Sequence, residues 1–416
     1  MPDITDTNSR DVFLCRQPIL DRQRQLFAYA LPFRGAGFTD GGVETVAVVT
    51  ETFSEPSLAE ALGPYQGFIK VGQDLLFSDR IHTLPPQTVV LEILDSVIQT
   101  PEMIDRCEQL RHAGYALATH ARAESSNIDE YPLLRLVEFI KVDTRGVEPK
   151  CLERLVQALK PLRRSLLAEG VDSDEQRHRC HEFGFDLFQG YHFARPAAAQ
   201  GQRLQSSEAA LLRLLGLISQ DADTAEIEVA FKQEPALTIN LLRLTNSAGS
   251  GLTIRITSLR HAITLLGRRQ LLRWLQLLLY SGASSSSTVA NPLLQLAATR
   301  GRLMELLIDH MPEARQYGRN LIDQAFMVGI LSLMPILLGA GFGEALARLP
   351  LAAPVLDALG ERRGVLGELL ALVEALEEET PERATLILLQ DLPGLDAARI
   401  NACLAWALVW ANNLAR

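Results

Sequence analysis

The stretch Phe139-Ile140-Lys141-Val142-Asp143 decides the fold of the first half of the chain. It is a short apolar run with charged residues at its end, which is typical of a buried strand that leads to a polar surface. Comparable runs recur before and after it, with helical patterns between them. The predicted strands are Leu26–Phe33, Gly67–Val71, Thr88–Ile93, Tyr115–Ala118, Phe139–Val142, Ser165–Ala168 and Asp186–Phe188.

Amphipathic segments between these runs predict helices over Pro101–Ala113, Lys150–Leu162 and Ser173–Phe183. Gly114 and Gly184 directly follow the first and the third, where glycine commonly ends a helix. Strands that alternate with helices predict a parallel sheet, and about seven strands in roughly 190 residues favour a (β/α) barrel over a doubly wound sheet. No GxGxxG follows the first predicted strand, which disfavours a dinucleotide-binding fold.

The composition of the chain changes near residue 197. Residues 197–207 are rich in Ala, Gln and Ser, which is typical of a linker. Beyond Ser207, leucines recur at helical spacing and strand patterns nearly vanish, so the second half is predicted to be all-α. We expect an α/β barrel domain at 1–197, a linker at 198–207 and a helical domain at 208–416 whose core ends near residue 400.

Composition narrows the function classes. The formal charge is −10 over 416 residues, which argues against a dedicated nucleic-acid binder. Five scattered cysteines without a CxxC motif, and no secretory pattern near Met1, predict a cytoplasmic protein. Residues 325–343 carry no charge, but Gly329, Ser332 and Pro335 interrupt them, so a buried helix with a glycine-rich turn is expected instead of a membrane span.

Catalytic groups of a (β/α) barrel lie at the C-terminal ends of its strands. Several residues at these ends are charged, which predicts a polar site at one mouth of the barrel, although ordinary loop charges remain an alternative. The residues at the predicted ends are Arg34, Gly72, Glu92, Thr119, His120, Lys141, Asp143, Glu169 and Gln189.

Four segments, in this order, resemble the successive motifs of the EAL domain family: Leu91–Ser96, Ile140–Asp143, Ala168–Asp172 and Gln189–Pro196. The resemblance implies a (β/α)8-type barrel with an antiparallel first strand, of the kind found in bacterial phosphodiesterases that hydrolyse cyclic di-GMP. The second half resembles the HDOD domain, which is related to HD hydrolases. The segments that carry this resemblance are Glu234–Ala248, Ile256–Ile263 and Leu265–Gly267. Together they look like a bacterial EAL–HDOD signalling protein.

The departures from the EAL pattern concern its metal ligands. An active member is expected to hold two divalent cations through carboxylates and other hard oxygen ligands. The signature glutamate falls at Ala30, the asparagine ligand at Gly72 or Gln73, and the paired aspartates at Thr119 and His120. We therefore expect no bound metal, no catalytic residue and no cofactor.

Six residues of the EAL site survive: Arg34, Glu92, Lys141, Asp143, Glu169 and Gln189. In one interpretation they form a structural network in which Lys141 pairs with Glu92 or Glu169. In the other they form a ligand pocket without chemistry, where Arg34 grips a phosphate and the segment 189–196 frames a guanine.

The helical half lacks the His-Asp pair of HD hydrolases, and Gly329-Ile330-Leu331-Ser332-Leu333 stands at the corresponding position, so no phosphohydrolase is expected there. The resemblance then implies a catalytically inactive scaffold that recruits protein partners, such as a sensor kinase, a cyclic di-GMP enzyme or a motility protein. The alternative is a receptor that binds cyclic di-GMP, or another nucleotide, without hydrolysis. A homodimer is left open, because the dimerisation face of the family lies near the altered 118–122 loop.

Overall fold

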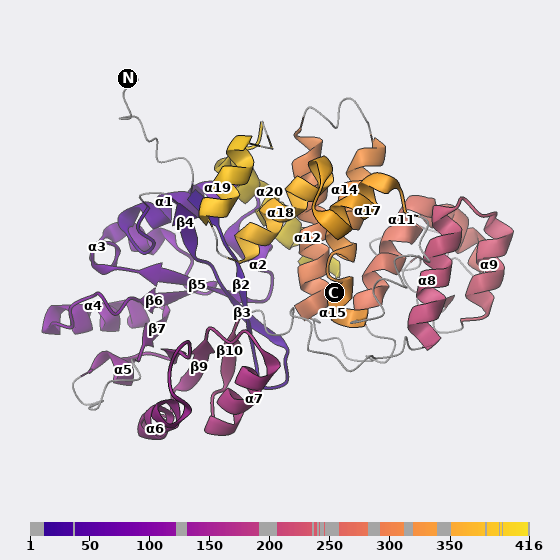
Figure 1. Cartoon of the computed structure of the whole chain (residues 1–416). Coiled ribbons are helices and arrows are strands. Elements are labelled where there is room, and N and C mark those ends of the chain that lie inside the picture. The colour runs from indigo at the N-terminus through magenta and orange to yellow at the C-terminus, as the bar shows by residue number, and fades with distance from the viewer. Residues whose placement is uncertain are drawn as a thin grey trace.

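The computed structural model describes residues 12–35, 38–121, 131–190, 206–234, 237–238, 241, 245, 258–281, 292–311, 319–338, 351–378, 381–390, 392 and 394–414. Figure 1 shows the first half as a barrel wrapped by helices and the second half as a group of packed helices beside it. The predicted combination of an α/β barrel and an all-α domain is confirmed.

Eight strands close the barrel in the order β10-β2-β3-β5-β6-β7-β8-β9. The strand β2 is antiparallel to both of its neighbours, and the other pairs are parallel, as the family resemblance implies. The strands are β2 (Gln17–Leu20), β3 (Leu26–Ala30), β5 (Gln66–Val71), β6 (Val89–Ile93), β7 (Ala116–His120), β8 (Phe139–Asp143), β9 (Ser165–Glu169) and β10 (Leu187–Gln189).

The first predicted strand, Leu26–Phe33, is divided in the structure. The strand β3 ends at Ala30, and after Pro32 the chain enters β4 (Phe33–Gly35), which pairs with β1 (Val12–Leu14) outside the barrel. Proline lacks the N–H that a continuing ladder needs. Arg34 therefore lies on a separate two-stranded sheet, and the prediction that it ends a barrel strand is wrong.

The three predicted helices are present, and their ends lie within one residue of those expected except that the second ends three residues early. They are α4 (Pro101–His112), α6 (Pro149–Leu159) and α7 (Asp174–Phe183), and the short helix η3 (Lys160–Leu162) continues α6. Ser173 caps α7 by accepting the backbone N–H of Gln176, and Gly184 ends it with a φ of 112°. The remaining helices of the barrel half are α1 (Val43–Thr52), α2 (Leu58–Leu62), α3 (Gln73–Leu76), η1 (Asp79–Thr83) and α5 (Leu133–Leu136).

The helical half begins with α8 at Ser206, so the last two residues of the predicted linker belong to a helix, and residues 198–205 lie outside the described residues. No helix among the described residues is long and apolar enough to cross a membrane. The helices are α8 (Ser206–Ser219), α9 (Thr224–Lys232), α11 (Leu259–Ser281), α12 (Pro292–Asp309), α14 (Arg319–Leu331), α15 (Met334–Leu338), α17 (Ala353–Glu361), α18 (Gly364–Glu377), α19 (Pro381–Gln390) and α20 (Ala397–Leu414).

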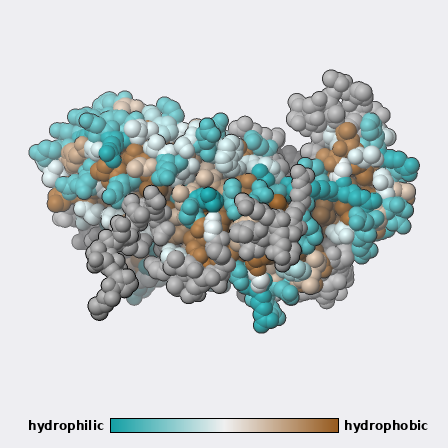
Figure 2. Space-filling view, turned by 90° about the horizontal axis from the view of Figure 1, so that it is seen from above, coloured by the Kyte–Doolittle hydropathy of each residue, from teal (hydrophilic) through white to brown (hydrophobic). Residues whose placement is uncertain are grey.

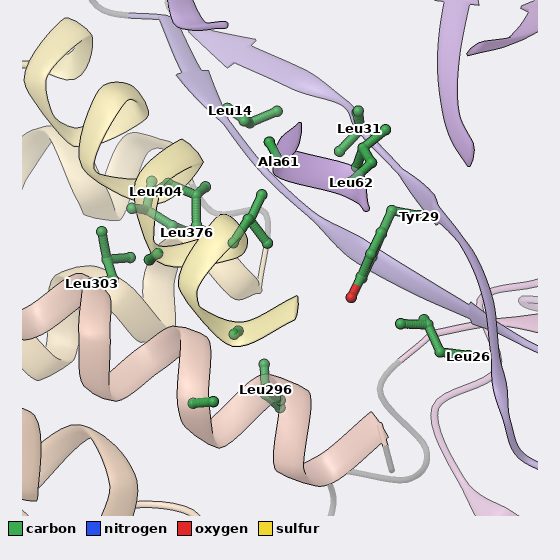
Figure 3. Close-up of a cluster of buried hydrophobic side chains, with 14 of the residues drawn as sticks. Leu14, Leu26, Tyr29, Leu31, Ala61, Leu62, Leu296, Leu303, Leu376 and Leu404 are labelled. Carbon is green, nitrogen blue, oxygen red and sulfur yellow. The ribbon is translucent and has the colours of Figure 1, made fainter. Parts of the chain in front are cut away.

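The two halves share a buried interface that α20 dominates. Figure 3 shows apolar side chains of β1, β3 and α2 facing those of the C-terminal helices. Figure 2 shows hydrophilic residues over much of the face of the barrel half that is turned to the viewer. Buried amides join the halves as well. The Asn401 side chain accepts the N–H of Leu14 and donates to the carbonyl of Val12, both at 2.8 Å. Asn412 donates to the carbonyl of Ala61 at 2.7 Å.

Candidate functional site

The site lies at the mouth of the barrel. Side chains alternate along a strand, so residues two positions apart point to the same side. A buried apolar layer fills the barrel interior, with Phe68, Val90, Phe139 and Leu167 among its members. Two residues further along each of these strands, the chain presents a charged side chain on the same face. These polar positions are Lys70, Glu92, Lys141 and Glu169, with His120 and Gln189 on two further strands.

Lys141 lies at the centre of the polar layer. Its Nζ donates to Glu92 Oε2 at 2.6 Å and lies 3.6 Å from Glu169 Oε2, and the Lys141 and Glu92 side chains are 1% and 2% exposed. Burial alone would lower the pKa of Lys141, but the two carboxylates outweigh that effect and raise it. Lys141 is therefore a buried cation held between two acids.

His120, which sequence reasoning assigns to an aspartate position of the family, joins this ion cluster. Its Nε2 lies 3.1 Å from Glu169 Oε2 and 3.6 Å from Glu92 Oε1. Burial would raise the pKa of Glu169, but Lys141 and His120 beside it hold that pKa well below its usual range. Glu169 is therefore ionised throughout the physiological range.

Arg34 is linked to the residues of the barrel mouth by an ion pair with Asp40, which Lys70 also approaches. Its Nη1 donates to Asp40 Oδ2 at 3.0 Å, and Lys70 Nζ lies 3.8 Å from the same oxygen. The Asp40 side chain is 8% exposed, and this burial raises its pKa to about 6 against the opposing effects of Lys70 and Arg34. Lys70 also lowers the pKa of Glu169, so this group and the Lys141 cluster form one electrostatic network.

The other two surviving residues stand apart from this network. Asp143 ends β8, is half exposed, and pairs with Arg145 through two contacts of 2.9 and 2.8 Å. Gln189 is buried and donates to Gln17 Oε1 at 2.7 Å. The structure thus brings together Glu92, Lys141 and Glu169 and leaves Asp143 turned to solvent; residues 191–196 of the predicted guanine frame lie outside the described residues.

Ala30, Gly72 and Thr119, where sequence reasoning expects family ligands to be missing, make other contacts. Ala30 belongs to the apolar layer inside the barrel. The backbone N–H of Gly72 donates to the carbonyl of Gly41 at 2.7 Å, and a Cβ at Gly72 would lie only 3.2 Å from that oxygen. Thr119 donates its hydroxyl to the carbonyl of Ile93 at 3.2 Å.

The residues at the mouth do not fit a pair of divalent cations. Among the described residues, no group of three or more His, Cys, Asp or Glu side chains is placed to hold a metal ion. The inward acids Glu92 and Glu169 already face Lys141, and two hard cations need more carboxylate oxygens than these. The described residues can hold an anionic group near Arg34 and Lys70, and their acids offer fewer oxygens than two hard cations need.

The helical half shows a similar substitution at its HD-like position. Ser332 accepts a hydrogen bond from Arg300 Nη1 at 2.7 Å, and Arg300 also pairs with Glu377. Gly329 lies where α14 crosses α12 so closely that a Cβ would meet the Cα of Gly301 at 2.6 Å. A close helix crossing and an ion pair therefore stand where the ligands of an HD hydrolase would be expected.

Sequence reasoning missed Lys70, Asp40 and Gln17. Lys70 lies inside a predicted strand, and its place two residues after Phe68 was a usable signal. Asp40 lies in a loop that reaches the mouth because Gly41, with a φ of 92°, packs against Gly72, and no local pattern reports such a contact.

Residues 71–196 match the family model of the EAL domain, and residues 206–340 match that of the HDOD domain. The uncharacterized protein YuxH of Bacillus subtilis is 27% identical over 413 residues, which covers 97% of this chain and 98% of that protein. The cyclic di-GMP phosphodiesterase CdgJ of Vibrio cholerae is 28% identical over 375 residues, with 88% and 85% covered.

A solved structure of a standalone EAL protein from Vibrio cholerae O395, in a form bound to c-di-GMP, is 19% identical with a TM-score of 0.37. The match covers 45% of this chain and 93% of that one. The two family matches are consecutive and together span more than half of the sequence. The chain therefore carries an EAL domain followed by an HDOD domain.

Proposed function

We propose that this chain is a signalling protein linked to cyclic di-GMP whose barrel does not hydrolyse that nucleotide, and that it acts through its surfaces on protein partners. One observation supports the loss of hydrolysis above all. Ala30, Gly72, Thr119 and His120 stand where the family resemblance implies metal ligands, and none of them supplies a carboxylate. The acids that remain, Glu92 and Glu169, lie 2.6 and 3.6 Å from the Lys141 ammonium.

The partners implied by the family are a sensor kinase, a cyclic di-GMP enzyme or a motility component. The buried contacts of Asn401 and Asn412 join the helical half to the barrel. Removing either half would expose these groups and the apolar surface around them, so a partner is best sought with the full chain as bait.

The second candidate is a receptor that binds cyclic di-GMP in the barrel without turnover. It is favoured by Arg34 and Lys70, which flank Asp40 at the mouth and are 30% and 23% exposed. Two cations at a partly open mouth suit a phosphate group, and Arg34 can hold one through two N–H donors.

The deciding experiment is a calorimetric titration of the full chain with cyclic di-GMP, first with Mg²⁺ or Mn²⁺ and then with excess chelator, while samples are analysed for linear product. We expect no product in either buffer. Steady, metal-dependent formation of product would overturn the proposal and align this chain with its relative CdgJ, which is named as a phosphodiesterase.

The same titration separates the two candidates. Saturable binding that is lost in Arg34→Ala supports the receptor, and Arg24→Ala is the matched control because Arg24 pairs with Asp174 far along the chain, at an exposed site. The absence of binding supports the scaffold. Ala30→Glu, Thr119→Asp and His120→Asp together are expected to leave turnover well below that of an active EAL enzyme, because Gly72 still offers no side-chain ligand for a metal.

A further inference from the structure

The helical half contains a polar groove that neither domain resemblance assigns. Residues of α11, α14 and the start of α17 line a cavity of about 310 Å³, and a second cavity of about 500 Å³ adjoins it. Asn320 and Gln324, one turn apart on α14, line both cavities, so the two adjoin along α14; the groove means the first cavity, between α11 and α14. Figure 1 shows these helices next to one another in the helical half. Volumes of this size are those of small-molecule sites.

Three arginines of α11 line the groove: Arg268, Arg269 and Arg273. The acids nearby are already engaged, since Arg269 donates to Asp323 at 2.6 Å and both Arg273 and Arg302 pair with Glu305. With four arginines against three acids (Asp221, Glu305 and Asp323), this part of an acidic chain carries a local excess of one positive charge.

Arg268 is the arginine of this group with the weakest acidic partner. Its nearest carboxylate is that of Asp221, 3.6 Å away on a side chain that is 89% exposed. Among the described residues, Arg268 Nη1 has no hydrogen-bond partner although that atom is buried. A buried N–H without an acceptor is unfavourable, so the groove is suited to an external acceptor.

The backbone strengthens this argument. Gly267 has a non-helical conformation with a φ of 73°, so Arg268 and Arg269 begin the second segment of α11. The start of a helical segment favours anions and disfavours cations. These arginines therefore do not stabilise the segment they begin, and an anion bound to both would satisfy the side chains and the segment together.

The rest of the groove indicates what the anion is attached to. Leu272, Met327 and Val355 provide an apolar wall, and Asn320 and Gln324 provide amides that can read the donor and acceptor edge of a heterocycle. We propose that this groove binds a nucleoside phosphate, with its phosphate on Arg268 and Arg269 and its base against the apolar wall. This site is separate from the barrel mouth.

The test is calorimetry on the full chain with AMP, GMP, CMP and UMP as probes, and with inorganic phosphate as the probe for the anion alone. We expect at least one nucleotide to bind saturably and at least about tenfold more tightly than phosphate. Arg268→Glu is expected to weaken that binding at least about tenfold, whereas Arg260→Glu, on the same helix but paired with Glu228, leaves it unchanged.

Asn320→Ala keeps the proposal testable if Arg268→Glu does not fold, because Asn320 is exposed; we expect a loss of a few-fold that differs between bases. The proposal is overturned if no nucleotide saturates the protein below about 1 mM, or if phosphate binds as tightly as the nucleotides. It is also overturned if Arg34→Ala, at the barrel mouth, abolishes the binding while Arg268→Glu preserves it.

Discussion

The barrel mouth and the interface between the two halves both bury polar side chains, but they satisfy them by different means. At the mouth, Lys141 balances Glu92 and Glu169 through charge. At the interface, Asn401 and Asn412 complete the hydrogen bonds of backbone groups without any charge. Charged networks change with pH and with the loss of one partner, whereas neutral amides respond only to the loss of their hydrogen bonds.

The barrel mouth can therefore change its protonation with pH, whereas the interface amides keep the two halves joined without a titrating group. Asp40, with a pKa raised to about 6, titrates near neutral pH, and its neighbours Arg34 and Lys70 are partly exposed. The side-chain amides of Asn401 and Asn412, on α20, do not titrate in this range. Each of the following changes tests that contrast.

The largest effect is expected for Lys141→Met. It leaves Glu92 buried without its cation, and removing one partner of a buried ion pair costs about 3–5 kcal/mol of unfolding free energy. Urea unfolding measures the loss. The double variant Lys141→Met/Glu92→Gln is expected to recover most of it, because the uncompensated charge is gone. Equal losses in the single and double variants would show that packing matters more than charge, and Lys232→Met, on an exposed pair, is the control.

The next effect is that of Asn401→Ala. It leaves the N–H of Leu14 and the carbonyl of Val12 buried without partners, which costs about 2–4 kcal/mol. Unfolding at two pH values should give the same loss, since no charge is involved. Asn413→Ala, at an exposed position on the same helix, is the matched control with an effect near zero. A loss that varies strongly with pH would show that a charged group, and not only the neutral Asn401 amide, contributes to this contact.

Asp40 is expected to make stability depend on pH. Its pKa is about 6 in the folded chain and 3.8 as the ordinary value, so the folded state holds the proton more tightly. The stability that Asp40 contributes is therefore present below about pH 4 and is lost as the pH rises through about 6, by an amount on the order of 3 kcal/mol.

Asp40→Asn removes this dependence. The unfolding free energy of the wild-type chain should fall relative to that of the variant between about pH 4 and pH 7. Glu169, whose lowered pKa acts in the opposite direction at more acidic pH, is common to both proteins and cancels in the difference. A constant gap across this range would show that the Asp40 carboxyl keeps an ordinary pKa.

The smallest effect is expected for Asp143→Asn. Asp143 pairs with Arg145 on the surface, and exposed pairs contribute about 0–1 kcal/mol. We expect unchanged stability within about 0.5 kcal/mol and unchanged ligand binding at the mouth, by unfolding and calorimetry. A large loss of binding would place Asp143 back in the site with the other surviving residues.

The barrel was largely predictable from local patterns. The helices α4 and α7 begin and end as their capping residues indicate, because caps act within one turn. The strand β2 was missed because it is short and contains Pro18, which disfavours a strand when only the sequence is read. Its antiparallel place in the barrel followed from the family resemblance instead.

The site was predictable only in part. The pairing of Lys141 with Glu92 and Glu169 follows from adjacent parallel strands whose ends meet at one edge. The role of Asp40 depends on how a loop packs, and that of Asn401 on a strand at the other end of the described chain. Such contacts are set by tertiary packing, which leaves no periodic signal in one sequence.

The hydrogen bond that the Leu14 backbone N–H donates to the Asn401 side chain has a consequence for synthesis on the ribosome. The two residues are 387 positions apart, so at typical elongation rates β1 emerges roughly 20–80 s before the residue that completes it. During that interval the backbone of β1 lacks the partner that finally covers it, and an uncovered strand edge is prone to pair with other chains. The nascent chain therefore passes through a period in which chaperone protection of its first strand is most needed.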